Sequence, residues 1–201
     1  YLPTAIAANG SIKAVEPKTD TPGATPSSPA SAAPEVIFFG GALNSASNEE
    51  GLRWFGQHII PRLKAHYGLA IPRILVAGRF PSDDLRKYLE SRGIEVFANP
   101  PDLVPFLAEA GLVIFPIRRA GAAARRVLEA MAAGRPVLAT PQAIHGLVLA
   151  PCHDVWIAED ADRFTSAIVK LWDDKGLRAA LGQAAARTAQ ERYDRSIADE
   201  T

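Results

Sequence analysis

Several features that would by themselves define a class of protein are missing from this sequence. Its 201 residues include one cysteine, Cys152, so no disulfide can form within the chain, which fits a reducing compartment such as the cytoplasm. We expect this cysteine to be buried and structural, with a thiol nucleophile as the alternative.

The sequence also lacks an excess of charge of either sign, long apolar runs and clustered histidines. The 22 basic residues balance the 22 acidic ones, so no overall field favours nucleic acid or an anionic membrane as a partner. No apolar run approaches the roughly 18 residues that a membrane span needs. His58, His66 and His153 show no ligand spacing, so we expect no metal site, and His145 is only a candidate site residue. We expect no cofactor either.

The residues that are present divide the chain into two zones. Residues 1–34 are rich in proline, alanine, serine and threonine, and such a segment cannot bury enough apolar surface to offset its ordering entropy. We expect it to be a largely disordered linker, followed by one folded domain over residues 35–201. The chain does not begin with methionine, and we interpret it as a piece of a longer protein.

From residue 35 onward, short apolar runs alternate with helical patterns. The repeated βα units predict an α/β fold, a Rossmann-like doubly wound parallel sheet with helices on both faces. Ligands of such sheets bind beyond the carboxyl ends of the strands. The expected strands are Val36–Phe39, Ile74–Ala77, Ile94–Phe97, Leu112–Phe115, Val137–Ala139 and Val155–Ile157.

Polar residues and glycines suggest where the helices begin and end. We expect Asn48, Ser82, Asp102 and Asp160 to open helices, because short polar side chains cap the free N–H groups of a first turn. Gly111 is expected to end the helix that Asp102 opens.

The stretch PIRRAGAAARRVLEAMAAGRPVLAT, residues 116–140, is the most informative part of the chain. A strand leads through a loop into a helix, and the N-terminus of a helix attracts anions such as a diphosphate. Glu129 lies about two turns along this helix, where its carboxylate could accept hydrogen bonds from a ribose diol. An ordinary αβ unit with solvated arginines is the alternative. The polar loop and first turns contain Arg118, Arg119, Gly121, Arg125 and Arg126.

The run VLEAMAAGRPVLAT resembles the signature of the retaining nucleotide-sugar glycosyltransferases of family 4. These enzymes have the GT-B fold, in which two Rossmann-like domains face each other across a cleft, and this chain resembles the C-terminal, donor-binding half. The family signature contains two glutamates separated by seven residues. The second matches Glu129 and implies a ribose contact. The first, which contacts the donor sugar in the family, falls at Gly121 and is not acidic.

A bacterial subgroup associated with exopolysaccharide and exosortase loci lacks the first glutamate as well. Its Pro-Leu-Arg stretch before the helix resembles Pro116-Ile117-Arg118, and Arg126 stands where the subgroup has lysine. The segment from Gly93 to Asp102 resembles the one whose backbone meets the nucleobase. Further similar segments lie at 39–43, 139–146 and 7–10, the last of which resembles the linker that enters the C-terminal domain.

The resemblance implies candidate roles for individual residues. Arg118 or Arg126 would neutralise the diphosphate and stabilise the leaving nucleotide, as electrostatic catalysis requires. Asp102 would neighbour the nucleobase or serve only as a helix cap. The remaining candidates are Gly40 and Gly41, which would admit a phosphate or simply form a tight turn, and Arg79, which would face the cleft or the surface.

The expected activity is transfer of a sugar from a UDP- or GDP-linked donor to a glycan or lipid-linked acceptor, in polysaccharide or glycoconjugate synthesis and without a metal. Acceptor contacts would lie on an N-terminal GT-B domain outside this chain, so the chain alone would catalyse little. One alternative is a degenerate scaffold or regulatory module, which the absent first glutamate and the lack of an arginine in the glycine turn favour. Another is a different GT-B enzyme, such as a sugar-nucleotide epimerase, although no acid–base constellation supports it.

Overall fold

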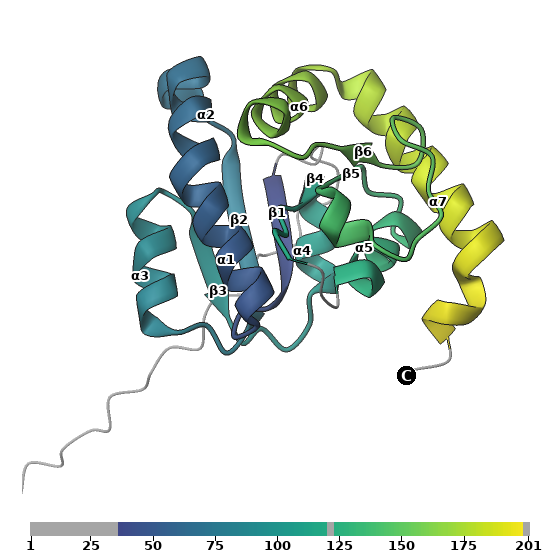
Figure 1. Cartoon of the computed structure of the whole chain (residues 1–201), viewed down its shortest axis with the longest axis horizontal. Coiled ribbons are helices and arrows are strands. Elements are labelled where there is room, and N and C mark those ends of the chain that lie inside the picture. The colour runs from purple at the N-terminus through teal and green to yellow at the C-terminus, as the bar shows by residue number, and fades with distance from the viewer. Residues whose placement is uncertain (1–35, 120–122, 199–201) are drawn as a thin grey trace, which may run out of the picture.

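The computed structural model describes residues 36–119 and 123–198, and within them six parallel strands alternate with helices (Figure 1). The strands are β1 Val36–Ala42, β2 Arg73–Arg79, β3 Glu95–Ala98, β4 Ala110–Phe115, β5 Val137–Ala139 and β6 Trp156–Ile157. The helices are α1 Ala46–Trp54, α2 Ile60–Tyr67, α3 Asp83–Ser91, α4 Val104–Glu109, α5 Ala123–Ala132, α6 Ala161–Asp173 and α7 Lys175–Ala198. A π-helical segment, Phe55–Ile59, joins α1 to α2, and short 3-10 turns span Gly68–Ala70 and Pro141–Ile144.

The strand order is β3-β2-β1-β4-β5-β6, with every neighbouring pair parallel. The order reverses direction between β1 and β4, which is the switch point of a doubly wound sheet. Right-handed crossovers then place α1, α2 and α3 on one face and α4 and α5 on the other. Helix contacts agree with this division, because α6 packs against α2 while α7 packs against α5 (Figure 1). The expected α/β, Rossmann-like fold is confirmed.

Side-chain caps explain where several helices begin. Ser82 accepts a hydrogen bond from the Leu85 N–H at 3.1 Å, and Asp160 accepts one from the Arg163 N–H at 2.8 Å, as the sequence predicts. Asn48 is not a cap, because α1 begins earlier, after Ser45. The Asn48 amide instead donates back to the Ala42 carbonyl at 2.8 Å, which ties the first turn of α1 to the end of β1.

The glycines that follow Phe39 lie inside β1 and not in a turn, so the predicted strand end at Phe39 is too early. Close packing between β1 and β2 explains why the residue opposite Gly41 is also a glycine. A Cβ built on Gly78, the residue opposite Gly41 in β2, would lie 1.8 Å from the Gly41 carbonyl oxygen. The carboxyl ends of β1 and β2 can therefore approach each other closely only because residue 78 is a glycine.

Gly111 does not end α4, as expected, but is a buried residue of β4. The helix passes directly into the strand because Ala110 already has extended backbone angles, φ −69° and ψ 119°. No left-handed glycine turn is needed at this junction. Every residue of β4 is buried, which places this strand at the centre of the core.

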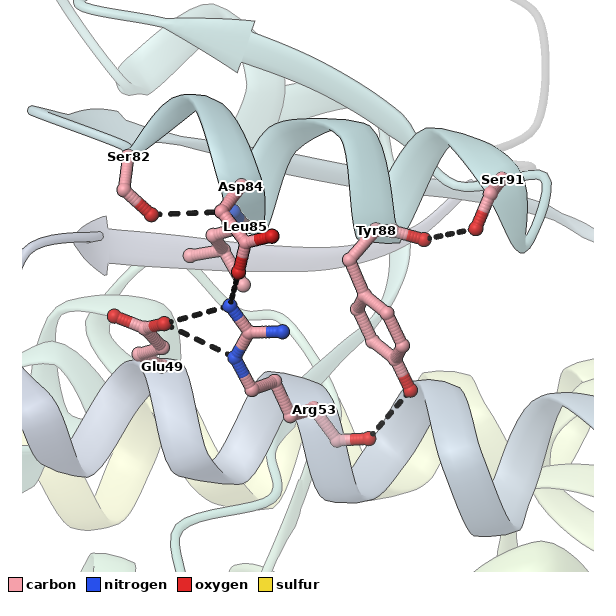
Figure 2. Close-up of polar contacts among 7 residues, drawn as sticks. All are labelled: Glu49, Arg53, Ser82, Asp84, Leu85, Tyr88 and Ser91. Carbon is pink, nitrogen blue, oxygen red and sulfur yellow. Dashed lines mark hydrogen bonds and ion pairs between the residues drawn. The ribbon is translucent and has the colours of Figure 1, made fainter.

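An ionic contact joins α1 to α3 above the sheet. Figure 2 shows Arg53 between two carboxylates, with Glu49 at 2.9 Å and Asp84 at 2.5 Å. The Tyr88 hydroxyl donates to the Arg53 carbonyl at 3.1 Å, and the Arg53 guanidinium lies 5.2 Å from the centre of the Tyr88 ring. These two carboxylates raise the pKa of Arg53 through hydrogen bonding, against a smaller lowering by burial.

The long helix α7 packs against α5 through another close backbone contact. A Cβ on Gly182 would lie 2.4 Å from the carbonyl oxygen of Gly134, at the end of α5. Arg178 anchors the start of α7, because its guanidinium donates to the carbonyl of Leu171 at 2.9 Å and also to that of Trp172.

Two further expectations concern the ends and loops of the chain. The predicted linker, residues 1–34, lies outside the described residues. Cys152 is exposed and not buried as expected, and it lies in the loop before β6 with a positive φ of 61°. Among the helices that the structure describes, none is long and apolar enough to cross a bilayer.

We predict that Gly78→Ala destabilises the protein. The new Cβ would overlap the Gly41 carbonyl, which is backbone and cannot rotate away, so the free energy of unfolding should fall by about 1–3 kcal/mol or more in urea titrations. Gly176→Ala is the matched control, since its Cβ would meet only the Asp174 carboxylate at 3.3 Å. Equal stability of the two variants would contradict the proposed packing.

A second prediction concerns Asp154, which is 2% exposed. Burial raises the pKa of this carboxyl, but hydrogen bonds from the Ala150 N–H, His153 and Thr188 outweigh it and hold the pKa below its ordinary value. The resulting stabilisation is present above the ordinary Asp pKa and is lost as the pH falls through the folded-state pKa. Asp154→Asn should therefore lower stability at pH 7, with the difference shrinking below about pH 4.

The measurement is urea denaturation at a series of pH values. Asp162→Asn serves as the exposed control, because the Asp162 side chain is 85% exposed. A stability difference between wild type and Asp154→Asn that does not change with pH would contradict the assigned pKa direction.

Candidate functional site

A groove of about 600 Å³ lies between α4 and α5, beyond the carboxyl ends of β1 and β2. We call it the α4–α5 groove. One wall consists of the loop after β3 and α4, and the other consists of α5. The lining residues are Gly41, Gly78, Arg79, Pro100, Pro101, Asp102, Leu103, Val104, Leu107, Ala108, Arg126, Glu129, Ala132, Ala133 and Arg135.

Most residues that the sequence singled out meet in this groove. Gly41, Arg79, Asp102, Arg126 and Glu129 all line it, although they come from four separate segments of the chain. A smaller recess of about 30 Å³ lies against the sheet, and it is lined by Gly40 together with Arg126 and Glu129. The sheet topology brings these side chains together, because the elements that carry them all start or end at the same edge.

Glu129 and two arginines form an ionic cluster on α5. The Arg126 Nη1 atom lies 2.6 Å from Oε2 of Glu129, and the Arg125 Nε atom lies 3.1 Å from Oε1. Spacings of three and four residues place these groups on one side of the helix. The Glu129 side chain is 27% exposed, so its carboxylate is partly shielded but still reachable from the groove.

Asp102 lines the groove just before α4, but it is not the N-cap that the sequence predicts, because Leu103 occupies that position. Its Oδ1 atom accepts a hydrogen bond from the Val104 N–H at 2.9 Å, which satisfies a free donor at the start of the helix. The residue is exposed, and this hydrogen bond uses only the Oδ1 atom of its carboxylate. Asp102 therefore contacts the first residue of α4 without capping the helix, and its place beside a nucleobase stays a prediction.

Arg118 does not lie in the α4–α5 groove. Its guanidinium stacks over the Trp54 ring at 4.8 Å from the ring centre and donates to the Glu159 carbonyl at 2.6 Å. It lines a separate groove of about 520 Å³ along α1, together with Arg119, which pairs with Glu50 at 2.6 Å. Gly121 lies outside the described residues.

The sequence did not single out Arg135, which also lines the groove. Burial lowers the pKa of its guanidinium, and its Nε atom is buried without a hydrogen-bond partner among the described residues. A bond of 3.4 Å runs from its Nη1 atom to the Ala110 carbonyl. An arginine that follows a helix-ending glycine has no distinctive pattern, so only the three-dimensional arrangement reveals it.

The electrostatic character of the groove follows from these residues. Three arginines, Arg79, Arg126 and Arg135, accompany two carboxylates, Asp102 and Glu129, so the lining carries one net positive charge. The rest is largely apolar, from prolines, leucines, valine and alanines. Such a site suits a ligand with a flat organic part and an anionic part. Within the described residues, no cluster of three or more acidic, histidine or cysteine side chains could hold a metal ion.

Comparison with known proteins assigns the chain to a family. The family described as glycosyl transferases group 1 matches residues 33–174, and the chain therefore belongs to it. No curated protein sequence matches the chain.

Solved structures share its fold. WaaG, a glycosyltransferase involved in lipopolysaccharide biosynthesis, is 18% identical with a TM-score of 0.65, and the match covers 83% of this chain and 45% of that one. Anabaena HepE, in complex with UDP and glucose, is 16% identical with a TM-score of 0.62, covering 80% and 44%. The C-terminal domain of LpcC from Francisella tularensis is 16% identical with a TM-score of 0.61, covering 78% and 86%.

These similarities show the Rossmann-like fold of GT-B glycosyltransferases. The chain spans less than half the length of WaaG and of HepE. It spans most of the LpcC C-terminal domain.

The contacts of Arg118 lead to a third prediction. Arg118→Ala removes the stacking on Trp54 and the hydrogen bond to Glu159, which should cost roughly 1 kcal/mol and lower the melting temperature by about 2–4 °C. Arg119→Ala is the neighbouring control. Its side chain is 75% exposed, and removal of an exposed ion pair should change stability by less than about 0.5 kcal/mol. Thermal melts of both variants test the difference, and equal melting temperatures would contradict it.

Proposed function

We propose that this chain is the donor-binding domain of a retaining GT-B glycosyltransferase of family 4, related to the bacterial exopolysaccharide and exosortase-associated subgroup. Its reaction would transfer a sugar from a nucleotide diphosphate sugar to a glycan or lipid-linked acceptor. The observation that carries this proposal is the presence of Arg126 and Glu129 in one groove at the carboxyl edge of the sheet. Family membership supports it, and so does HepE, which was solved with UDP and glucose.

In this proposal the nucleoside lies in the α4–α5 groove with its ribose at Glu129. Each carboxylate oxygen of Glu129 already accepts a bond from an arginine, but an ionised carboxylate offers about four lone-pair sites. The ribose hydroxyls can therefore donate to Glu129 while Arg125 and Arg126 stay in place. The loop that contains Asp102 then lies beside the base.

The diphosphate would be stabilised by positive side chains without a metal ion. Arg126 is the principal candidate, and Arg79 lies at the end of β2 in the same groove. When the bond between the anomeric carbon and the diphosphate oxygen breaks, that oxygen keeps the electron pair and gains negative charge. The acceptor hydroxyl oxygen forms the new bond to carbon, and its proton passes to the leaving diphosphate. A guanidinium fixed near the leaving oxygen lowers the energy of this charged state.

The acceptor would bind to a second domain that faces this one across a cleft. The solved relatives WaaG and HepE are about twice as long as the matched part, which supports a second domain of similar size. We expect this domain to supply the acceptor contacts, so that the present chain binds the donor but turns over little.

A second candidate function is a non-catalytic scaffold or regulatory module with the same fold. Two observations favour it. Gly121 stands where the family has its first glutamate, and Arg118 is engaged with Trp54 and Glu159 outside the groove. Nucleotide binding distinguishes the two candidates, because a scaffold need not retain it.

The deciding experiment is calorimetric titration of the 201-residue chain with UDP, GDP and their sugar conjugates. We expect one nucleotide to bind, and Glu129→Ala to weaken its binding more than about tenfold, or 1.4 kcal/mol. Glu90→Ala is the matched control, since Glu90 is an exposed helical glutamate on α3. Circular dichroism verifies that each variant is folded. Failure of every nucleotide to bind to the folded chain, or equal affinity of Glu129→Ala and wild type, would contradict the proposed donor site.

A further inference from the structure

Two residues with unusual backbone angles follow the ends of neighbouring strands. Phe80 comes directly after β2 with φ 57°, and Asn99 comes directly after β3 with φ 53°. Asparagine tolerates this left-handed conformation better than other residues with a side chain, but a bulky phenylalanine rarely adopts it. The strain at Phe80 therefore needs a compensating interaction.

Asn99 makes one hydrogen bond to Phe80 and a second one to Gly78 in the neighbouring strand. Its backbone N–H donates to the Gly78 carbonyl at 2.8 Å, and its side-chain Oδ1 accepts from the Phe80 N–H at 2.8 Å. We call this pair the Phe80–Asn99 clasp. Apolar burial cannot be the compensation at Phe80, because the residue is 63% exposed. The side-chain bond from Asn99 is thus the contact that holds Phe80 in its strained conformation.

The clasp connects two walls of the α4–α5 groove. Gly78 and Arg79, just before Phe80, line the groove from β2, and Pro100 to Val104, just after Asn99, line it from the loop before α4. Gly78 itself cannot shift toward β1, because the Gly41 carbonyl already occupies the space beside it. The clasp therefore joins the loop that contains Asp102 to the part of β2 that packs closely against β1.

We propose that Asn99 is a positioning residue for the nucleotide. By holding Phe80, it fixes the spacing between Arg79 on one side of the groove and the Pro100–Val104 loop on the other. A nucleoside diphosphate touches both sides at once, with its charged part near Arg79 and its base near the loop, so the spacing determines how well both contacts form together. This inference rests on the proposed function, since the ligand positioned is the nucleotide of the donor.

The experiment compares nucleotide affinity with thermal stability in three variants. Asn99→Gly keeps the left-handed backbone and the bond to Gly78 but removes the side-chain acceptor. We expect it to weaken binding of UDP or GDP, whichever binds to wild type, by about fivefold or more. Its melting temperature should fall by only about 2–4 °C, because one hydrogen bond is lost. Asn99→Asp keeps an acceptor oxygen for the Phe80 N–H and should bind within about twofold of wild type. Asn44→Gly is the control, because Asn44 is exposed in the turn after β1.

Phe80→Gly tests the strain itself. Glycine adopts a positive φ freely and keeps the N–H that donates to Asn99, so this variant should melt at a higher temperature than wild type and still bind the nucleotide. Hydrogen exchange of the Phe80 amide gives a readout independent of ligand. The amide should exchange slowly in wild type and in Asn99→Asp, and faster in Asn99→Gly.

The outcomes separate the two proposals. If wild type binds a nucleotide but Asn99→Gly binds it equally well, the positioning role is wrong and the donor site stands. A rapidly exchanging Phe80 amide in wild type would also overturn the positioning role. If wild type binds no nucleotide, the proposed function fails, and the positioning role fails with it even where the amide is protected.

Discussion

The close approach of β1 and β2 at Gly41 and Gly78 is the constraint on which the carboxyl edge of the sheet depends. The Gly41 carbonyl fills the space that a Cβ on Gly78 would occupy, so the two strand ends can lie this close only with glycine at position 78. The start of α1 is tied to this edge through Asn48, and the end of β3 is tied to it through Asn99. A rigid edge of this kind lets side chains from distant segments keep fixed positions relative to one another.

Electrostatics adds a second level of organisation on α5. Arg125, Glu129 and Arg126 lie on one side of a single helix, where each arginine restricts the rotamers open to the glutamate. These ion pairs hold the polar groups of α5 in one arrangement, so a charged ligand of the proposed kind would require little rearrangement of them. Isolated exposed pairs contribute little to stability, so the value of this cluster lies in orientation rather than in folding energy.

The sequence predicted the architecture well because alternating apolar strands and polar caps are local signals. The predicted strand Val137–Ala139 matches β5, and Ser82 caps its helix as expected. Residue types alone did not predict which arginines lie in the α4–α5 groove. Arg118 and Arg126 look equivalent in the sequence, but Trp54 provides a stacking surface that only the fold brings near Arg118. Arg135 was missed for the same reason, since its place in the groove depends on contacts made by packing.

The contact between Gly182 and the Gly134 carbonyl has a mechanical consequence. At this contact almost no free space remains between the end of α5, which bears Glu129, and α7. Helix α7 runs for 24 residues, or about 36 Å. Because backbone atoms meet there, α5 and α7 cannot come closer at this point unless one of the two backbones shifts. The position of α5, and of Glu129 on it, is thus tied to the packing of a helix that lies more than 40 residues later in the chain.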